Sequence, residues 1–138
     1  MVRFLASPKG GGKTSKLISM ANESVTLTDG IIVFIDDDQR HIHDLHRDIR
    51  FVEAENSTFN NYSEFAGFIL GVLSQNSDIA HIYVDGFVSL TCNQEGHKDL
   101  IALLDRLVDI AEKEHVNFTL STHMEASALP EEIVQRLI

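Results

Sequence analysis

The sequence predicts an α/β domain in which helices cover both faces of a mostly parallel sheet, a three-layer α/β/α sandwich. Continuous β-branched and aromatic runs, such as 31–35 and 79–84, lack the alternation of a half-exposed strand and indicate strands buried on both faces. Segments with apolar residues at helical spacing separate these runs, and this order favours right-handed crossovers between parallel strands. At 138 residues, with no linker or repeat, the chain 1–138 is expected to form a single domain.

The first half of the chain supplies the first strands and one helix. An apolar stretch at 2–6 predicts a strand, and apolar residues at helical spacing over 14–22 predict the helix that follows it. The buried strand 31–35 comes next. The polar segment 39–48 is expected to be helical, and residues 51–52 to form a short strand.

The second half continues the alternation of helices and strands. Asn61, followed three residues later by Glu64, has the pattern of a helix N-cap, and an apolar stripe predicts that this helix ends near Gln75. The remaining elements are expected as a strand over 79–84, a helix over 100–111, a strand over 116–120 and a final helical segment that Pro130 opens.

Composition and charge narrow the class of function. Hydrophobic residues make up 43% of the chain and charged residues 23%, which is typical of a globular protein. The formal net charge of −10 repels phosphate backbones and anionic lipids, so nucleic acid is not expected as a main partner. A single cysteine, Cys92, excludes an intramolecular disulfide, and the chain has no apolar signal core or membrane-spanning run. We therefore expect a cytoplasmic location and no membrane partner.

The run Ser7-Pro8-Lys9-Gly10-Gly11-Gly12-Lys13-Thr14 has the pattern of a phosphate-binding loop between a strand and a helix, although Ser7 stands where the full pattern has glycine. Its glycines allow left-handed backbone that turns successive amide N–H groups toward phosphate oxygens. Lys13 is expected to reach the β- and γ-phosphates, and the Thr14 hydroxyl to bind Mg²⁺. The candidate nucleotide-binding residues are Pro8, Lys9, Gly10, Gly11, Gly12, Lys13, Thr14 and Ser15.

The strand 79–84 followed by Asp85 has the form of a Walker B element, an apolar strand that ends in an acid. Its carboxylate is expected to hold Mg²⁺ through a water or to accept a hydrogen bond from Thr14. Other polar groups, at 36–38 and 121–123, also follow predicted strands. Ligands of parallel sheets bind at this carboxyl edge, so the sequence predicts a site there.

Four stretches resemble the RecA-like branch of P-loop ATPases: 11–14, 33–38, 83–90 and the segment from 107 to 123. The resemblance implies a P-loop NTPase core that binds ATP and Mg²⁺. It also implies that Asp38, or its neighbour Asp37, orients the attacking water, and that His123 contacts the γ-phosphate. The family usually has Glu at the water-orienting place, so the resemblance implies nucleotide binding more directly than hydrolysis.

Two other functions remain open beside a Mg²⁺-dependent ATPase. The Ser-Pro-x-x-x-Gly-Lys-Thr loop also resembles that of thymidine kinases, which implies a small-molecule or nucleoside kinase. Alternatively, the short chain and the Asp in place of Glu favour a non-catalytic, nucleotide-responsive module with a protein partner. Few residues follow 121–123, so the DNA-holding strands of recombinases are not expected. If one copy of the chain supplies Arg106 or Arg136 to the nucleotide site of a neighbouring copy, the protein must form a homo-oligomer.

Overall fold

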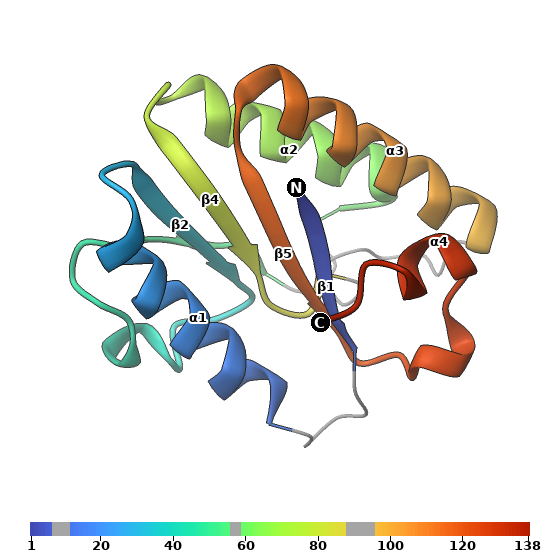
Figure 1. Ribbon diagram of the computed structural model, residues 1–138, viewed down its shortest axis with the longest axis horizontal. Coiled ribbons are helices and arrows are strands. Elements are labelled where there is room, and N and C mark those ends of the chain that lie inside the picture. Colours follow the sequence, from blue (N-terminus) through green and yellow to red (C-terminus); the bar gives the residue numbers. More distant parts are fainter. Residues whose placement is uncertain (7–11, 56–58, 88–95) are drawn as a thin grey trace.

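Five parallel strands form one sheet at the centre of the molecule (Figure 1). The computed structural model of the protein describes residues 1–6, 12–55, 59–87 and 96–138. The spatial order of the strands is β1 (Val2–Ala6), β5 (Asn117–Thr122), β4 (Ile79–Val84), β2 (Ile31–Asp36) and β3 (Arg50–Glu53). Every neighbouring pair is parallel, which confirms the predicted α/β class and parallel sheet.

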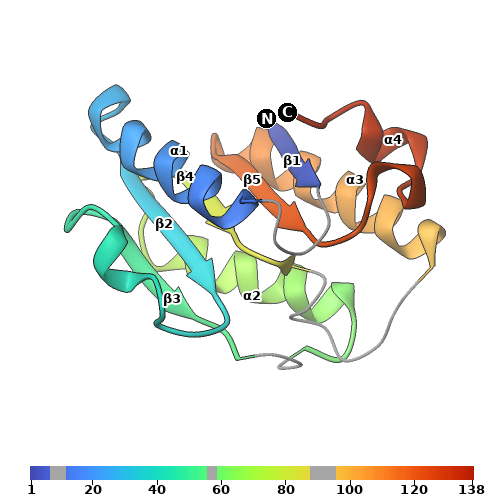
Figure 2. The same cartoon turned by 90° about the horizontal axis from the view of Figure 1, so that it is seen from below.

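Helices cover both faces of this sheet (Figures 1 and 2). Helix α1 (Lys13–Leu27) packs on one face, while α2 (Tyr62–Ser74) and α3 (His97–Glu114) lie side by side on the other. The short elements are η1 (Ile42–Asp44), η3 (Ala126–Ala128) and α4 (Glu131–Val134), the last of which follows Pro130 directly. No helix in the described ranges is both long enough and apolar enough to cross a membrane.

The free side of β1 is covered by the last residues of the described chain. The Phe4 amide donates to the Arg136 carbonyl (2.9 Å), and the Ile138 amide donates to the Phe4 carbonyl (3.0 Å). The guanidinium of Arg136 donates to the Val2 carbonyl at 3.3 Å. These contacts satisfy backbone groups that a bare edge strand would expose.

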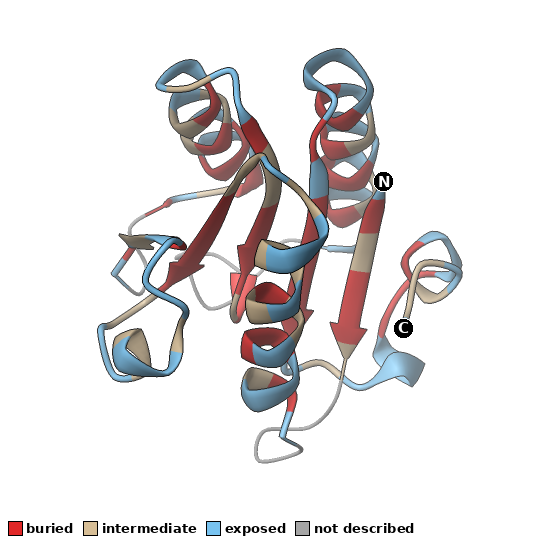
Figure 3. Ribbon diagram, turned by 60° about the vertical axis from the view of Figure 1, so that its left-hand side comes forward, coloured by how far each residue is buried: buried red, intermediate tan, exposed pale blue. Residues whose placement is uncertain are grey.

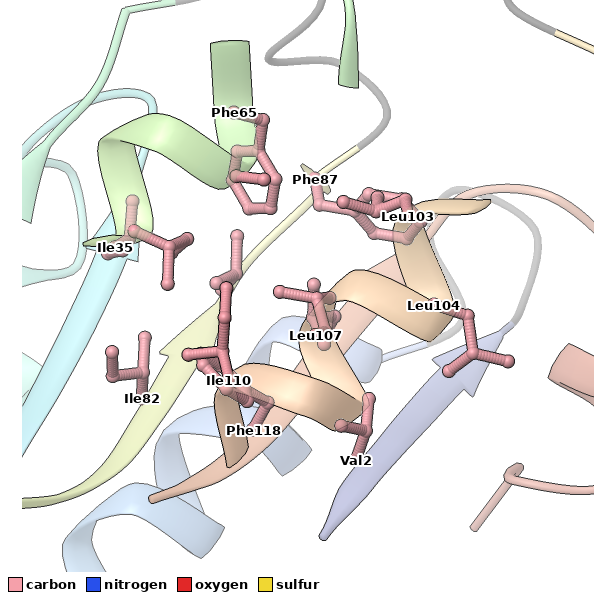
Figure 4. Close-up of a cluster of buried hydrophobic side chains, with 14 of the residues drawn as sticks. Val2, Ile35, Phe65, Ile82, Phe87, Leu103, Leu104, Leu107, Ile110 and Phe118 are labelled. Atoms are coloured by element: carbon pink, nitrogen blue, oxygen red, sulfur yellow. The ribbon is translucent and has the colours of Figure 1, made fainter. Parts of the chain in front are cut away.

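Each face of the sheet has its own apolar core, because the strands are buried on both sides (Figure 3). The larger core lies under α2 and α3. Figure 4 shows Leu103 and Leu107 of α3 with Phe87, and Phe65 of α2 beside them. The smaller core lies under α1 and includes Leu17, Ala21, Phe34 and Tyr83. The strands are buried on both faces, as predicted, so one apolar core forms on each side of the sheet.

Two predicted helix extents are wrong. Residues 39–48 form turns and the short η1 rather than a helix, because the Asn22 side chain binds this segment. Its amide group donates to the Asp44 carbonyl (3.0 Å) and accepts from the His46 amide (2.7 Å). Helix α1 continues beyond residue 22 to Leu27, because Ser24 in its last turns hydrogen-bonds the Tyr83 hydroxyl.

The other predicted elements are present, with ends that differ by a few residues. The Asn61 side chain accepts from the Glu64 amide at 2.9 Å, as expected of an N-cap. Strand β3 extends the predicted pair 51–52 by one residue at each end, and β5 ends at Thr122 rather than at residue 120.

His81 is a partly buried histidine on the α1 face of β4. Its ring stacks on Tyr83, with ring centroids 4.0 Å apart, and its Nε2 lies 2.8 Å from the Thr119 hydroxyl. Burial lowers the pKa of His81 to about 4, and the positive charges of Arg3 and the amino terminus act in the same direction. The folded protein therefore disfavours the charged ring.

We predict an acid-dependent loss of stability that His81 causes. The unfolded chain protonates this ring below its ordinary pKa of 6.5, whereas the folded chain does so only near 4. The free energy of unfolding should therefore fall between pH 6.5 and 4, by about 3 kcal/mol from this residue. Urea unfolding of wild type and His81→Gln across this range measures the difference, and parallel pH profiles for the two proteins would contradict the prediction.

Candidate functional site

The predicted nucleotide-binding residues lie where the chain passes from β1 into α1. Residues 7–11 are outside the described residues, so the predicted contacts of Pro8, Lys9, Gly10 and Gly11 are not described. Gly12 precedes the helix with a φ of 77°, in the left-handed region that glycine adopts without strain. The helix starts from it, since the Lys16 amide donates to the Gly12 carbonyl at 3.1 Å.

The first residues of α1 differ in their exposure. Lys13 is buried, with 6% of its surface exposed. Thr14 is half-buried and Ser15 is exposed. The amides at a helix N-terminus and its dipole favour an anion, so this end of α1 suits a phosphate group.

Asp85 joins the start of α1 to the ends of two strands. Its Oδ2 accepts from the Thr14 hydroxyl at 3.0 Å, and its Oδ1 accepts from the buried Ser121 hydroxyl at 2.6 Å. The Ser121 oxygen in turn accepts from the Gly86 amide at 2.8 Å. The two predicted metal-binding residues, Thr14 and Asp85, are therefore in direct contact, and Ser121 orients the Asp85 carboxylate.

Asp36 is the buried acid of this edge, with 5% of its surface exposed. Ile35 of β2 is in register with Val84 of β4, so Asp36 and Asp85 end neighbouring strands. One Asp36 oxygen accepts from the Asp37 amide at 2.7 Å. Burial above all, and then the Asp37 side chain and the charge of Asp85, raise the pKa of Asp36 to about 8. Burial therefore favours the protonated form of Asp36.

Asp38 is bound to a neighbouring arginine. Its side chain is 43% exposed and accepts from the Arg40 guanidinium at 2.7 Å and from the Arg40 amide at 2.8 Å. These hydrogen bonds lower the pKa of Asp38. Within the described ranges, only Asp36, Asp37 and Asp38 form a group of potential metal ligands whose ligand atoms all lie within 4.8 Å of one another. The water-orienting role of Asp38 or Asp37 stays a prediction.

The remaining predicted residues lie near the end of β5 or away from the edge. His123 is exposed directly after β5, and its contact with a γ-phosphate stays a prediction. Thr122 is buried, and its hydroxyl accepts from the Met124 amide at 3.2 Å. Arg106 lies on α3, and Arg136 is bound to β1, so neither belongs to the group around Asp85.

The chain matches no protein-family model, and no curated protein is significantly similar to it.

Sequence reasoning did not assign a role to Asp36 or to Ser121 alone. Asp36 ends β2 and Asp85 directly follows β4, so an acid stands at the carboxyl end of each apolar run, and this shared pattern is the signal that identifies Asp36. Ser121 carries no such signal, because its role depends on the order β1-β5-β4, which puts β5 between the other two strands.

We predict that Ser121→Ala lowers the free energy of unfolding by about 1 to 3 kcal/mol. The substitution removes the partner of the Gly86 amide and one donor to Asp85, and all three groups lie in the interior or at its edge. Chemical unfolding measures the loss. Ser127→Ala, at an exposed position of η3, is the control, and an equal effect in both variants would contradict the assignment.

We predict that Asp36→Asn stabilises the protein increasingly as pH rises. The unfolded chain releases the Asp36 proton near 3.8, but the folded chain keeps it up to about pH 8. Folding therefore requires proton uptake between these values, and this cost grows by up to about 1.4 kcal/mol per pH unit. The neutral amide avoids this cost.

Unfolding of wild type and Asp36→Asn at pH 4 to 8, with a chelator present, measures this effect. Asp105→Asn, on the exposed side of α3, is the matched control. A gap between wild type and Asp36→Asn that stays constant with pH would refute the prediction.

Proposed function

We propose that this domain binds ATP with Mg²⁺ at the carboxyl edge of its sheet and hydrolyses it. The observation that carries the proposal is the 3.0 Å hydrogen bond from the Thr14 hydroxyl to Asp85, which are 71 residues apart in sequence. It joins the end of the proposed phosphate loop to the acid of the proposed Walker B strand. This is the pairing that phosphate-loop chemistry needs around a magnesium ion.

The residues of this edge fit a magnesium–nucleotide complex. A hydroxyl and a carboxylate are oxygen ligands of the kind that Mg²⁺ prefers, and Mg²⁺ takes few direct protein ligands. Thr14 and Asp85 would hold the ion, directly or through water, with Ser121 fixing the carboxylate. When bound, Mg²⁺ neutralises charge on the β- and γ-phosphate oxygens.

A bound Mg²⁺ would also offset the negative charge of this edge. Asp37, Asp38 and Asp85 lie around it, and a triphosphate would be repelled by them without a counter-charge. Lys13 at the start of α1 supplies one positive charge to the phosphates, and the helix N-terminus supplies amide donors. In the proposed reaction these groups stabilise charge, while Asp38 or Asp37 orients the water and His123 contacts the γ-phosphate.

The ion pair of Asp38 with Arg40 favours a second candidate function, a nucleotide-responsive module that does not hydrolyse. An Asp side chain that accepts two hydrogen bonds from Arg40 has less capacity to orient a water. The module would then bind nucleotide and change its contact with a protein partner.

We predict that ATP with Mg²⁺ raises the melting temperature of wild type and that Lys13→Ala abolishes the shift. A ligand at 100 times its dissociation constant adds about 2.7 kcal/mol of stability, which is a shift of several degrees for a domain of this size. ATP, GTP and ADP are compared by thermal unfolding. Lys16→Ala, an exposed lysine three residues later on the same helix, is the matched control and should retain the shift.

Phosphate release in the same samples then separates the functions. Release that Asp38→Asn abolishes, with the thermal shift retained, supports the ATPase. A shift without release supports the switch, and phosphate transfer that requires an added nucleoside supports the kinase predicted from the loop sequence. No shift with any nucleotide would overturn the proposal.

A further inference from the structure

We propose that a second copy of this chain packs, across a two-fold axis, on the outward surface of α2 and the groove between α2 and α3, here called the α2–α3 face. This face lies on the opposite side of the sheet from α1 (Figures 1 and 2). The proposal does not depend on nucleotide binding.

The outward surface of α2 is almost uncharged. Its 13 residues include one charged side chain, Glu64, which lies in the first turn and accepts from Asn60 at 3.1 Å. The exposed positions beyond that turn are small or polar, and the half-buried ones are apolar: Gly67, Gly71, Ser74, Phe68, Leu70 and Val72. A surface helix normally carries charged side chains on its solvent side, and α3 does so. The composition of α2 is that of a helix with a further neighbour.

Two glycines in the interior of α2 support this inference. Gly67 and Gly71 are exposed and one turn apart, and a Cβ built at either position meets no atom within 4 Å. Packing within the described chain therefore does not require glycine at these positions, although glycine is among the least favourable residues inside a helix. Glycine does allow another backbone to approach closely.

The groove beside this surface can receive side chains. It has a volume of about 380 Å³ and lies between Ser63 and Gly67 of α2 and Asp99 and Arg106 of α3. Arg106 also lines an adjacent hollow of about 220 Å³ farther along α3. The two hollows together extend along much of the helix pair.

The charges of this face fit a second copy. Two chains of net charge −10 repel each other, so they meet most favourably where each has little net charge, as on α2. Asp99 and Arg106 lie two turns apart on the groove side of α3, and neither forms an ion pair with another described residue. A two-fold axis between them would bring Arg106 of each copy to Asp99 of the other, as an isologous interface requires.

The experiment is sedimentation velocity of the purified chain at physiological salt, over protein concentrations up to about 1 mM. We expect a concentration-dependent dimer in wild type. Gly67→Glu places an unpaired charge in the interface and should weaken dimerisation at least about tenfold. Arg106→Glu should weaken it to a similar degree, and the double variant Asp99→Arg/Arg106→Glu should recover the dimer.

Two controls keep the result interpretable. Ser19→Glu adds the same charge on the exposed side of α1, across the sheet, and should leave the dimer intact. Gly67→Ala should raise the melting temperature of the monomer by about 3 °C while weakening the dimer, so it tests the surface even if Gly67→Glu fails to fold.

A monomer at every concentration would overturn the proposal. So would a dimer that tolerates Gly67→Ala, Gly67→Glu and Arg106→Glu, or one that Ser19→Glu disrupts equally. Failure of the double variant to recover the dimer would overturn the two-fold arrangement.

Discussion

The hydrogen bonds of the Asp85 carboxylate hold the first helix and two strands in one arrangement. Thr14 is the second residue of α1, Asp85 directly follows β4, and β5 separates β1 from β4 in the sheet. The carboxylate therefore spans the end of β5, and the residue there must be small and able to donate to it. Ser121 meets both needs, and its oxygen also accepts from the amide that follows Asp85. Because each carboxylate oxygen has its own donor, the side chain is fixed before any ligand binds, which is the preorganisation that electrostatic stabilisation of a ligand requires.

The acidic side chains at this edge of the sheet lie in different environments. Asp36 is buried and its pKa is raised, so its protonated form is favoured beside Asp85. Asp38 is half-buried, and its charge is paired with that of Arg40. Acids whose environments move their pKa values apart are common at functional sites, although structural networks produce them too. Here the separation has two causes: burial removes solvent from the acid that ends the strand, and the hydrogen bonds from Arg40 lower the pKa of the acid two residues later.

The sequence predicts well what depends on local pattern and on the sheet. Strand β4 begins and ends as predicted because its apolar run packs on both faces of the sheet, with Ala80 and His81 partly exposed, and the N-cap at Asn61 depends only on the residue three positions later. The conformation of segment 39–48 and the end point of α1 are not predicted correctly, because they depend on contacts with residues distant in the sequence. Asn22 binds the first through its side chain, and Tyr83 holds the second through Ser24. The site divides in the same way: Thr14 and Asp85 have motif patterns, whereas the role of Ser121 comes from strand order.

One aromatic cluster connects the two proposed surfaces. Phe87 lies two residues after Asp85, and the rings of Phe4, Tyr62 and Phe65 surround it at centroid distances of 5.8 to 6.5 Å. Tyr62 also lines the groove between α2 and α3, where we propose that a second copy binds. Interiors are close-packed, so a side chain that moves in the groove must be matched by repacking of its neighbours. Phe87 follows the turn residues Asp85 and Gly86, so the groove and the carboxyl edge share one packed cluster of side chains. If a second copy displaces Tyr62 and a ligand binds at the carboxyl edge, as proposed, the two binding events are expected to change each other's affinity equally in both directions.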